Sequence, residues 1–231
     1  MKRLLNLCIA IIATTIGATA QTNNVVGAAQ FNRYAAENKA VPPRQKDEKR
    51  VVFIGNSITE FWNHTHPEFF TRNGYINRGI AGQTSYTLLL RFRADAIDLD
   101  PTAIVLGIGC NDIAVNDGAP YDEDRTYANI VTMAELAKAH GIKIVLTTIL
   151  PAASFPWRPE ITDAPDKIEN LNKRIRAYAT AHSIPFADYY TPMVHPGDRA
   201  LPVTFSDDGV HPNASGYTIM EPVIHSILTK L

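Results

Sequence analysis

Three side chains, one near the start of the chain and two near its end, could together carry nucleophilic catalysis. Asp208 and His211 stand three residues apart in a turn that contains Gly209 and Pro212. A carboxylate at that spacing could orient the imidazole, which would then accept the proton of a serine hydroxyl. Ser57 is the candidate nucleophile. Taken alone, His211 could equally be a turn residue, and Ser57 would fit helix capping better.

A second group of residues could stabilise the oxyanion that forms when an ester carbonyl is attacked. Residues 79–84 read Gly-Ile-Ala-Gly-Gln-Thr, and the glycines would let backbone amides approach a ligand. Asn111 could donate a side-chain N–H to the same oxyanion, while Asp112 could orient the loop. The residues alone leave open whether Gly79 or Gly82 supplies the amide. Each feature by itself is more often a tight turn or a helix cap.

These residues need a scaffold, and apolar runs that alternate with stretches of helical period predict a parallel sheet covered by helices. In such an open sheet, ligands bind at the carboxyl ends of the strands. Ser57 and Asn111 each come soon after a predicted strand. The predicted architecture is a three-layer α/β/α sandwich, with strands at residues 51–55, 75–78, 103–109, 142–150 and 185–188.

Three predicted helices have apolar faces that a sheet would have to cover. A fourth follows Asn213 and is interrupted by Pro222, where it could kink. The predicted buried positions are Leu89, Phe92 and Ala96 within residues 84–99; Tyr127, Ile130, Val131, Ala134 and Ala137; and Ile168, Leu171, Ile175, Tyr178 and Ala179.

Four short motifs, in this order along the chain, resemble the SGNH (GDSL-like) hydrolases. They are Gly55-Asn56-Ser57-Ile58, Gly82, Gly109-Cys110-Asn111-Asp112 and Asp208-Gly209-Val210-His211. Each motif is loose alone, but the set is specific and covers nearly all of residues 51–231. The resemblance implies a flavodoxin-like fold with a five-stranded parallel sheet. It also implies a carboxylic ester hydrolase that forms an acyl-enzyme on serine.

The resemblance assigns roles residue by residue and requires no metal or organic cofactor. The family usually has aspartate before the nucleophile, whereas this chain has Asn56. Because the acid of the triad is elsewhere, this change should affect the loop or the serine's environment more than the type of reaction. The implied catalytic residues are Ser57, Asp208 and His211, and the implied oxyanion donors are Ser57, Gly82 and Asn111.

The first twenty residues predict a secretory signal, because Lys2 and Arg3 precede an apolar run that ends in Ala-Thr-Ala. A membrane anchor is the alternative, but the run is shorter than the roughly 20 apolar residues that span a bilayer. A lipoprotein anchor at Cys8 is disfavoured because that cysteine comes early and follows no small residue. The predicted organisation is a signal peptide at 1–20, a polar lead-in segment at 21–50 that covers the domain surface, and the hydrolase domain at 51–231, in a periplasmic or extracellular protein.

The remaining composition argues against several partners. Removing residues 1–20 takes two of the 22 basic residues, which leaves 20 Lys and Arg against 23 Asp and Glu. This balance gives no basis for binding to nucleic acid or to an anionic membrane surface, and we expect no stable membrane insertion. Cys110 would then be the only thiol, without a disulfide partner, and should be buried and inert. His64 and His66 alone are too few for a metal site.

The loop at residues 151–159 carries the only indication of the substrate. We expect it to expose Phe155, Trp157 and Arg158 near the site, where aromatic rings would suit sugars or acyl chains; they could instead pack on the surface. No amphipathic lid is visible, which argues against a lipase at an oil interface. Export favours a short-chain acyl ester, such as an acetyl group on a carbohydrate. The alternatives are a lysophospholipase or thioesterase, and a non-catalytic glycan-binding module.

Overall fold

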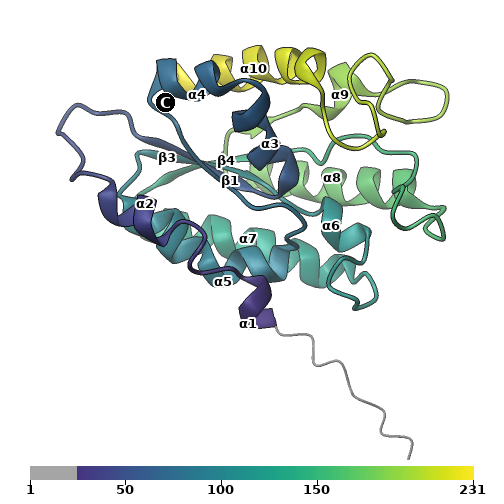
Figure 1. The fold of residues 1–231 in the computed structure, drawn as a ribbon, viewed down its shortest axis with the longest axis horizontal. Helices are drawn as coiled ribbons and strands as arrows, with labels where there is room; N and C mark the ends of the chain where they lie inside the picture. Colours follow the sequence, from purple (N-terminus) through teal and green to yellow (C-terminus); the bar gives the residue numbers. More distant parts are fainter. Residues whose placement is uncertain (1–24) are drawn as a thin grey trace, which may run out of the picture.

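The computed structural model describes residues 25–231, and its centre is a parallel five-stranded sheet (Figure 1). The strands lie in the order β2-β1-β3-β4-β5, so the chain adds strands on one side of β1 and then on the other. Open sheets bind ligands at this reversal point, between β1 and β3. The predicted α/β fold and its five parallel strands are confirmed. The strands are β1 (Val51–Gly55), β2 (Ile76–Gly79), β3 (Ala103–Gly107), β4 (Lys143–Thr147) and β5 (Phe186–Ala187).

Helices cover both faces of this sheet (Figure 1). One face packs against a mainly aliphatic core beneath α5 (Ser85–Asp95), α7 (Glu123–Ala139) and α8 (Ala164–Ala181). The other packs against α3 (Ser57–Thr65), α4 (Pro67–Asn73) and α10 (Ala214–Leu228). The shorter helices are α1 (Val25–Ala28), α2 (Ala35–Ala40), α6 (Cys110–Ile113), α9 (Tyr190–Met193) and the 3-10 turn η1 (Ile97–Leu99).

Glycines end the three strands on either side of the reversal point. Gly55 pairs with Gly79 on one side and with Gly107 on the other. A Cβ atom on Gly79 would lie 2.2 Å from the backbone nitrogen of Glu60 in α3, so only glycine allows this helix to pack so closely. The close packing places the first residue of α3 at the carboxyl edge of the sheet.

Aromatic contacts join the helix that begins at Ser57 to the helix that follows His211. Trp62 of α3 stacks on Tyr217 of α10, with ring centroids 5.4 Å apart. The Tyr217 hydroxyl donates a hydrogen bond to the carbonyl of Ile58, at 2.8 Å. Since α10 and α3 are fixed to each other in this way, the two segments that carry the candidate catalytic residues are held together through the core.

The buried faces of three helices differ in part from the prediction. On α7, Thr126 and Met133 are buried, whereas Tyr127 and Val131 are only half-buried. Tyr178 of α8 is also half-buried, and its ring lies 6.3 Å from that of Tyr127, with both side chains packed against the core on this face of the sheet. On α5, Leu88 is buried and Leu89 half-buried, and the inward face also carries the charged residues Arg91 and Asp95.

The strands differ from the prediction in length more than in position. β1 has the predicted bounds, and β2 is displaced by one residue. β3 and β4 are shorter than predicted, because residues 108–109 and 148–150 leave the sheet as buried apolar loop segments. The sequence stays apolar beyond the end of both strands, so the apolar pattern does not show where either strand ends. The last helix, α10, continues through Pro222 without interruption.

The lead-in segment packs along α5, which extends the prediction that it covers the domain surface (Figure 1). Ala29 is fully buried, and the nearly buried Arg50 donates to the carbonyls of Leu99 and Pro42 at 2.7 and 2.9 Å. No helix within residues 25–231 is long and apolar enough to cross a membrane. The predicted signal peptide lies outside the described residues.

Candidate active site

Ser57 lies at the turn between β1 and α3, as the first residue of the helix. Asn56 is the N-cap in extended conformation, and its side-chain oxygen accepts a hydrogen bond from the amide of Ile58 at 3.0 Å. This cap gives Asn56 a structural role at the position where the family that the chain resembles usually has aspartate. The amide of Ser57 itself meets no acceptor within residues 25–231 and remains available to a ligand.

The candidate nucleophile, base and acid form one hydrogen-bonded line. The Ser57 hydroxyl lies 2.9 Å from Nε2 of His211, and Nδ1 of His211 lies 2.6 Å from Oδ2 of Asp208. Because a carboxylate can only accept, we assign the imidazole proton to Nδ1. The free lone pair on Nε2 then faces the serine hydroxyl, which is the arrangement that general-base catalysis requires.

The turn that carries Asp208 keeps its carboxylate ionised. Its Oδ1 accepts hydrogen bonds from the amides of Val210 and His211 at 2.9 and 2.8 Å, and from the Ser206 hydroxyl at 3.1 Å. Desolvation raises the pKa of Asp208, but the bonds from His211 and Val210 outweigh it and lower the pKa to about 2. Gly209, with a φ of +78°, allows the tight turn. Asp208 can therefore stabilise a protonated His211.

Two aromatic rings flank the imidazole of His211. The ring of Phe61 lies 5.2 Å from it and that of Trp157 lies 5.9 Å away, the latter stacked at 28°. Phe61 was not predicted, although it follows Ser57 by four residues and so shares its helix face. The expected exposure of the aromatic loop was right for Trp157, which is 38% exposed, and wrong for Phe155, which is fully buried. Phe155 bridges back to Arg158, which is half-buried, so the loop folds inward.

The structure distinguishes the two candidate oxyanion glycines. The amide of Gly79 is used, because it donates to Oδ1 of Asn77 at 2.9 Å. The amide of Gly82 donates no hydrogen bond within residues 25–231, and Gly82 is exposed at a φ of +78°. This conformation favours glycine, and a Cβ there would meet nothing within 4 Å. Gly82 therefore keeps a free donor.

The amide group of Asn111 is oriented by partners on both sides. Its Nδ2 donates to the carbonyl of Gln83 at 2.9 Å, and its Oδ1 accepts from Nδ2 of Asn116 at 2.9 Å. Asn116 accepts in turn from the indole N–H of Trp157 at 2.8 Å. One N–H of Asn111 is left for an oxyanion. Asn116 was not predicted, since a single asparagine in a loop gives no periodic or motif signal.

Asp112 joins the loop after β3 to the start of α5. The Ser85 amide donates to both its carboxyl oxygens at 3.0 and 2.9 Å, and the Ser85 hydroxyl donates as well. Burial raises the pKa of Asp112 to about 6, against the lowering effect of these bonds. Asp112 thus ties the loop after β3 to the loop that contains Gly82 and ends at α5.

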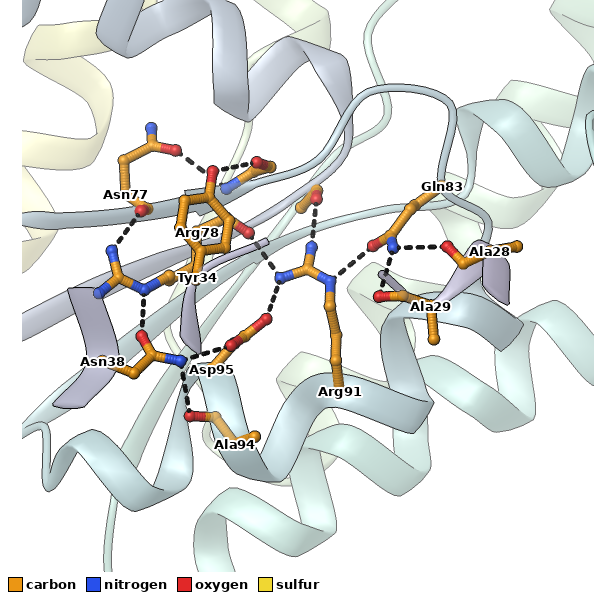
Figure 2. A network of polar contacts seen from close by, with 12 residues as sticks. Ala28, Ala29, Tyr34, Asn38, Asn77, Arg78, Gln83, Arg91, Ala94 and Asp95 are labelled. Atoms are coloured by element: carbon orange, nitrogen blue, oxygen red, sulfur yellow. Dashed lines mark hydrogen bonds and ion pairs between the residues drawn. The ribbon is translucent and has the colours of Figure 1, made fainter. Parts of the chain in front are cut away.

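The buried side chain of Arg91 holds the loops that follow β1 and β2 through hydrogen bonds. Figure 2 shows Arg91, whose side chain is 0% exposed, at the centre of a polar network. Its guanidinium donates to the carbonyl of Gly55 at 3.0 Å, to that of Arg78 at 2.9 Å and to Oε1 of Gln83 at 2.6 Å. Asp95 balances the charge at 3.0 Å. The network was not predicted, because Arg91 occupies a helix position where charge normally indicates solvent.

The remaining candidates have structural partners. His66 pairs with Glu221 at 2.6 Å, and His64 stacks on Phe61. Within residues 25–231, no group of three or more His, Cys, Asp or Glu side chains could hold a metal ion. Cys110 is buried, and burial raises the pKa of its thiol to about 12, which disfavours the reactive thiolate.

Known proteins resemble this chain in sequence and structure. The sequence model of the GDSL-like lipase/acylhydrolase family matches residues 53–219. A GDSL-like lipase of known structure from Bacteroides thetaiotaomicron is 56% identical, with a TM-score of 0.86 over 87% of this chain and 98% of that one. An acetylxylan esterase from Xylanibacter ruminicola is 24% identical over 80% of this chain and 44% of that protein. A lipoprotein from Bacillus subtilis, itself uncharacterized, is 37% identical over 33% of this chain and 32% of that protein. This chain matches less than half the length of these two curated relatives.

We expect Asp112 to make the stability of the protein fall as the pH rises through about 6. The pKa of its carboxyl is about 6 in the folded protein, against an ordinary value of 3.8. A raised folded-state pKa contributes stability fully below pH 3.8, and that contribution is lost above 6. The difference between the two pKa values corresponds to about 3 kcal/mol.

The measurement is the free energy of unfolding of the unsubstituted protein and of Asp112→Asn at pH 4 and pH 7. Subtracting the two proteins removes the other titrating groups. Because pH 4 already lies just above the ordinary pKa, the advantage of the unsubstituted protein should be about 2 kcal/mol smaller at pH 7 than at pH 4. An advantage that stays constant or grows would mean that the Ser85 donors hold the carboxylate ionised in acid.

Proposed function

This chain belongs to the GDSL-like lipase/acylhydrolase family, and we propose that it hydrolyses carboxylic esters through an acyl-enzyme on Ser57. The observation that carries the proposal is the unbroken line of hydrogen bonds from Ser57 through His211 to Asp208. A binding protein would have no need for a serine hydroxyl aligned with an imidazole whose far side meets a carboxylate.

The reaction has two proton transfers in each half. His211 Nε2 takes the proton of Ser57 as Oγ attacks the ester carbonyl carbon, and a tetrahedral oxyanion forms. When this intermediate collapses, the bond to the alcohol oxygen breaks and His211 returns the proton to the leaving alcohol. Water then attacks the acyl-serine with His211 again as base, which releases the carboxylic acid and restores the serine. Asp208 stays ionised and stabilises the imidazolium at each step.

Three donors are proposed for the oxyanion hole: the amides of Ser57 and Gly82 and the side chain of Asn111. Support comes from the hydrogen bonds that these groups do not make within residues 25–231, as neither amide has an acceptor and Asn111 keeps one free N–H. A donor of this kind typically contributes about 3 kcal/mol of barrier lowering. The reaction calls for no metal or organic cofactor.

We further propose an acetyl group on a carbohydrate as the substrate. The exposed indole of Trp157, stacked beside His211, offers a flat apolar surface that a sugar ring could cover, and the half-buried Arg158 and Asn116 offer polar groups near it. The relative named an acetylxylan esterase points to the same class of ester. The expected partners are small-molecule or glycan esters, with no nucleic acid and no stable membrane insertion.

We also propose that the protein is exported. The support is the signal-like pattern of residues 1–20, together with the lipoprotein among the relatives. Periplasmic and extracellular locations both fit a glycan ester as substrate, because such polymers are found on that side of the membrane.

Replacing the nucleophile should abolish activity. We expect Ser57→Ala to lower kcat for p-nitrophenyl acetate by at least about a thousandfold, because no other group can carry the acyl intermediate. A fluorophosphonate probe should label the unsubstituted protein and not the variant. Ser226→Ala, which removes an exposed serine of α10, is the matched control and should be fully active. Equal rates in Ser57→Ala and the unsubstituted protein would end the proposal.

The acyl group is tested by a series of p-nitrophenyl esters from acetate to decanoate. We expect kcat/KM for acetate to exceed that for octanoate by about tenfold or more, as an acetyl site leaves extra methylenes without a pocket. Acetylated xylan should release acetate. A preference for octanoate or longer chains, or hydrolysis of lysophospholipids without release of acetate from glycans, would favour the lysophospholipase or thioesterase reading instead.

The alcohol side is tested at Trp157. We expect Trp157→Ala to raise KM for an acetylated xylo-oligosaccharide about tenfold while KM for p-nitrophenyl acetate changes less, since only the glycan would cover the indole. Trp157→Phe keeps an aromatic surface and should restore the lower KM. If both substrates respond equally to Trp157→Ala, the indole does not bind the sugar.

A further inference from the structure

Hydrogen bonds of its backbone amides fix the turn around Gly82 only in part. Before Gly82, the amides of Ile80 and Ala81 donate to Gly55 and to the Glu60 carboxylate at 3.1 and 2.7 Å. After it, the amide of Gln83 donates to Ile80 at a long 3.4 Å. Gly82, between these hydrogen bonds, is exposed, and as a glycine it can adopt many backbone conformations. The position of its amide therefore depends on what fixes Gln83.

The side chain of Gln83 anchors this turn through three further hydrogen bonds. Figure 2 shows its Nε2 between the carbonyls of Ala28 and Ala29, at 3.0 and 3.1 Å, with its Oε1 toward Nε of Arg91. The bond from Arg91 is 2.6 Å long, and Gln83 is 3% exposed. Both amide hydrogens and the oxygen are thus used, which leaves the side chain a single orientation.

Gln83 also stands between two of the proposed oxyanion donors. Its peptide nitrogen follows Gly82 directly, and its carbonyl accepts the hydrogen bond that orients Asn111. A shift of the Gln83 backbone would move both donors at once. Donors in an oxyanion hole act only when they are held close to where the charge develops, so such a shift would lower the rate.

We propose that Gln83 is a positioning residue for the oxyanion hole, and that residues 28–29 of the lead-in segment hold it in place. The segment that the sequence marked only as a cover for the domain would then be part of the catalytic apparatus. This inference rests on the proposed function, because it takes Gly82 and Asn111 as the donors. It goes beyond that function by giving a role to residues outside the family match at 53–219.

Two substitutions test the role of Gln83. Gln83→Met keeps the length of the side chain and removes all three hydrogen bonds. Gln83→Glu keeps the acceptor for Arg91 and loses the two bonds to the lead-in segment. We expect both to lower kcat for p-nitrophenyl acetate about tenfold to a hundredfold with little change in KM. The affinity for phenylboronic acid, whose tetrahedral adduct with Ser57 mimics the transition state, should fall by a similar factor.

Arg50→Met is the matched control. Arg50 is also a buried polar residue of the lead-in segment, and it donates to the carbonyls of Leu99 at 2.7 Å and Pro42 at 2.9 Å and to the Glu48 carboxylate at 2.8 Å, but none of these partners belongs to the Arg91 network or to the oxyanion turn. It should lower the melting temperature as the Gln83 variants do and leave kcat unchanged. This comparison separates positioning from a general loss of stability.

The outcomes distinguish this inference from the proposed function. Wild-type kcat in Gln83→Met or Gln83→Glu would overturn the inference, and so would an equal loss of kcat in Arg50→Met. If Ser57→Ala abolishes activity in the same assay, the proposed function survives either result. If Ser57→Ala stays active, the proposed function itself fails.

Discussion

The geometry of this site depends on one buried charge, the guanidinium of Arg91. Buried donors must be satisfied, and a guanidinium does not escape by losing its proton, so its acceptors have to be in place whenever the chain is folded. Desolvation lowers the pKa of Arg91, and the nearby Asp95 opposes this effect. The acceptors include the carbonyl of Gly55, two residues before Ser57, and the side chain of Gln83, which follows Gly82 directly. The ends of β1 and β2 are thereby held in a fixed relation.

The proposed acid and base, Asp208 and His211, are held by a separate set of contacts on the opposite face of the sheet. The turn around His211 is closed by the bridge between Ser206 and Pro212, and Asn213 caps α10 by accepting from the amide of Gly216 at 3.1 Å. Tyr217 then ties α10 to the carbonyl of Ile58 beside the nucleophile. The start of α3 is therefore fixed from both faces of the sheet, and the serine and its base meet because two independent anchor systems converge on it.

This division explains which features were predictable from the sequence. The strands and the motif residues could be named because apolar runs mark the sheet, and because the chemistry repeats known residue types at strand ends. β1 was placed with its observed bounds, while β3 and β4 were drawn too long, since apolar loop residues continue past their ends. The assigned roles of Ser57, Asp208 and His211 remain proposals.

The supporting residues were not predictable for a physical reason. Arg91 and Gln83 are polar types that usually lie on the surface, and their burial follows from three-dimensional partners at sequence distances that no local pattern reveals. Phe155 was placed wrongly for the converse reason. An aromatic residue in a proline-rich loop suggests exposure, whereas this loop folds back on itself and buries the ring.

The surroundings of the carboxyl groups around the site give them very different pKa values. This difference suggests a reason for asparagine, rather than aspartate, at position 56. Asp208 keeps a low pKa because its hydrogen bonds include one from an imidazole, whereas burial holds the pKa of Asp112 high. Asn56 is 3% exposed and caps α3 through a single bond to the amide of Ile58. An aspartate there would add a second buried carboxylate next to the nucleophile, with fewer donors than Asp112 has. Asparagine caps a helix about as well as aspartate does and carries no charge. Asparagine at this position therefore preserves the turn that carries Ser57 and leaves Asp208 as the carboxylate that hydrogen-bonds His211.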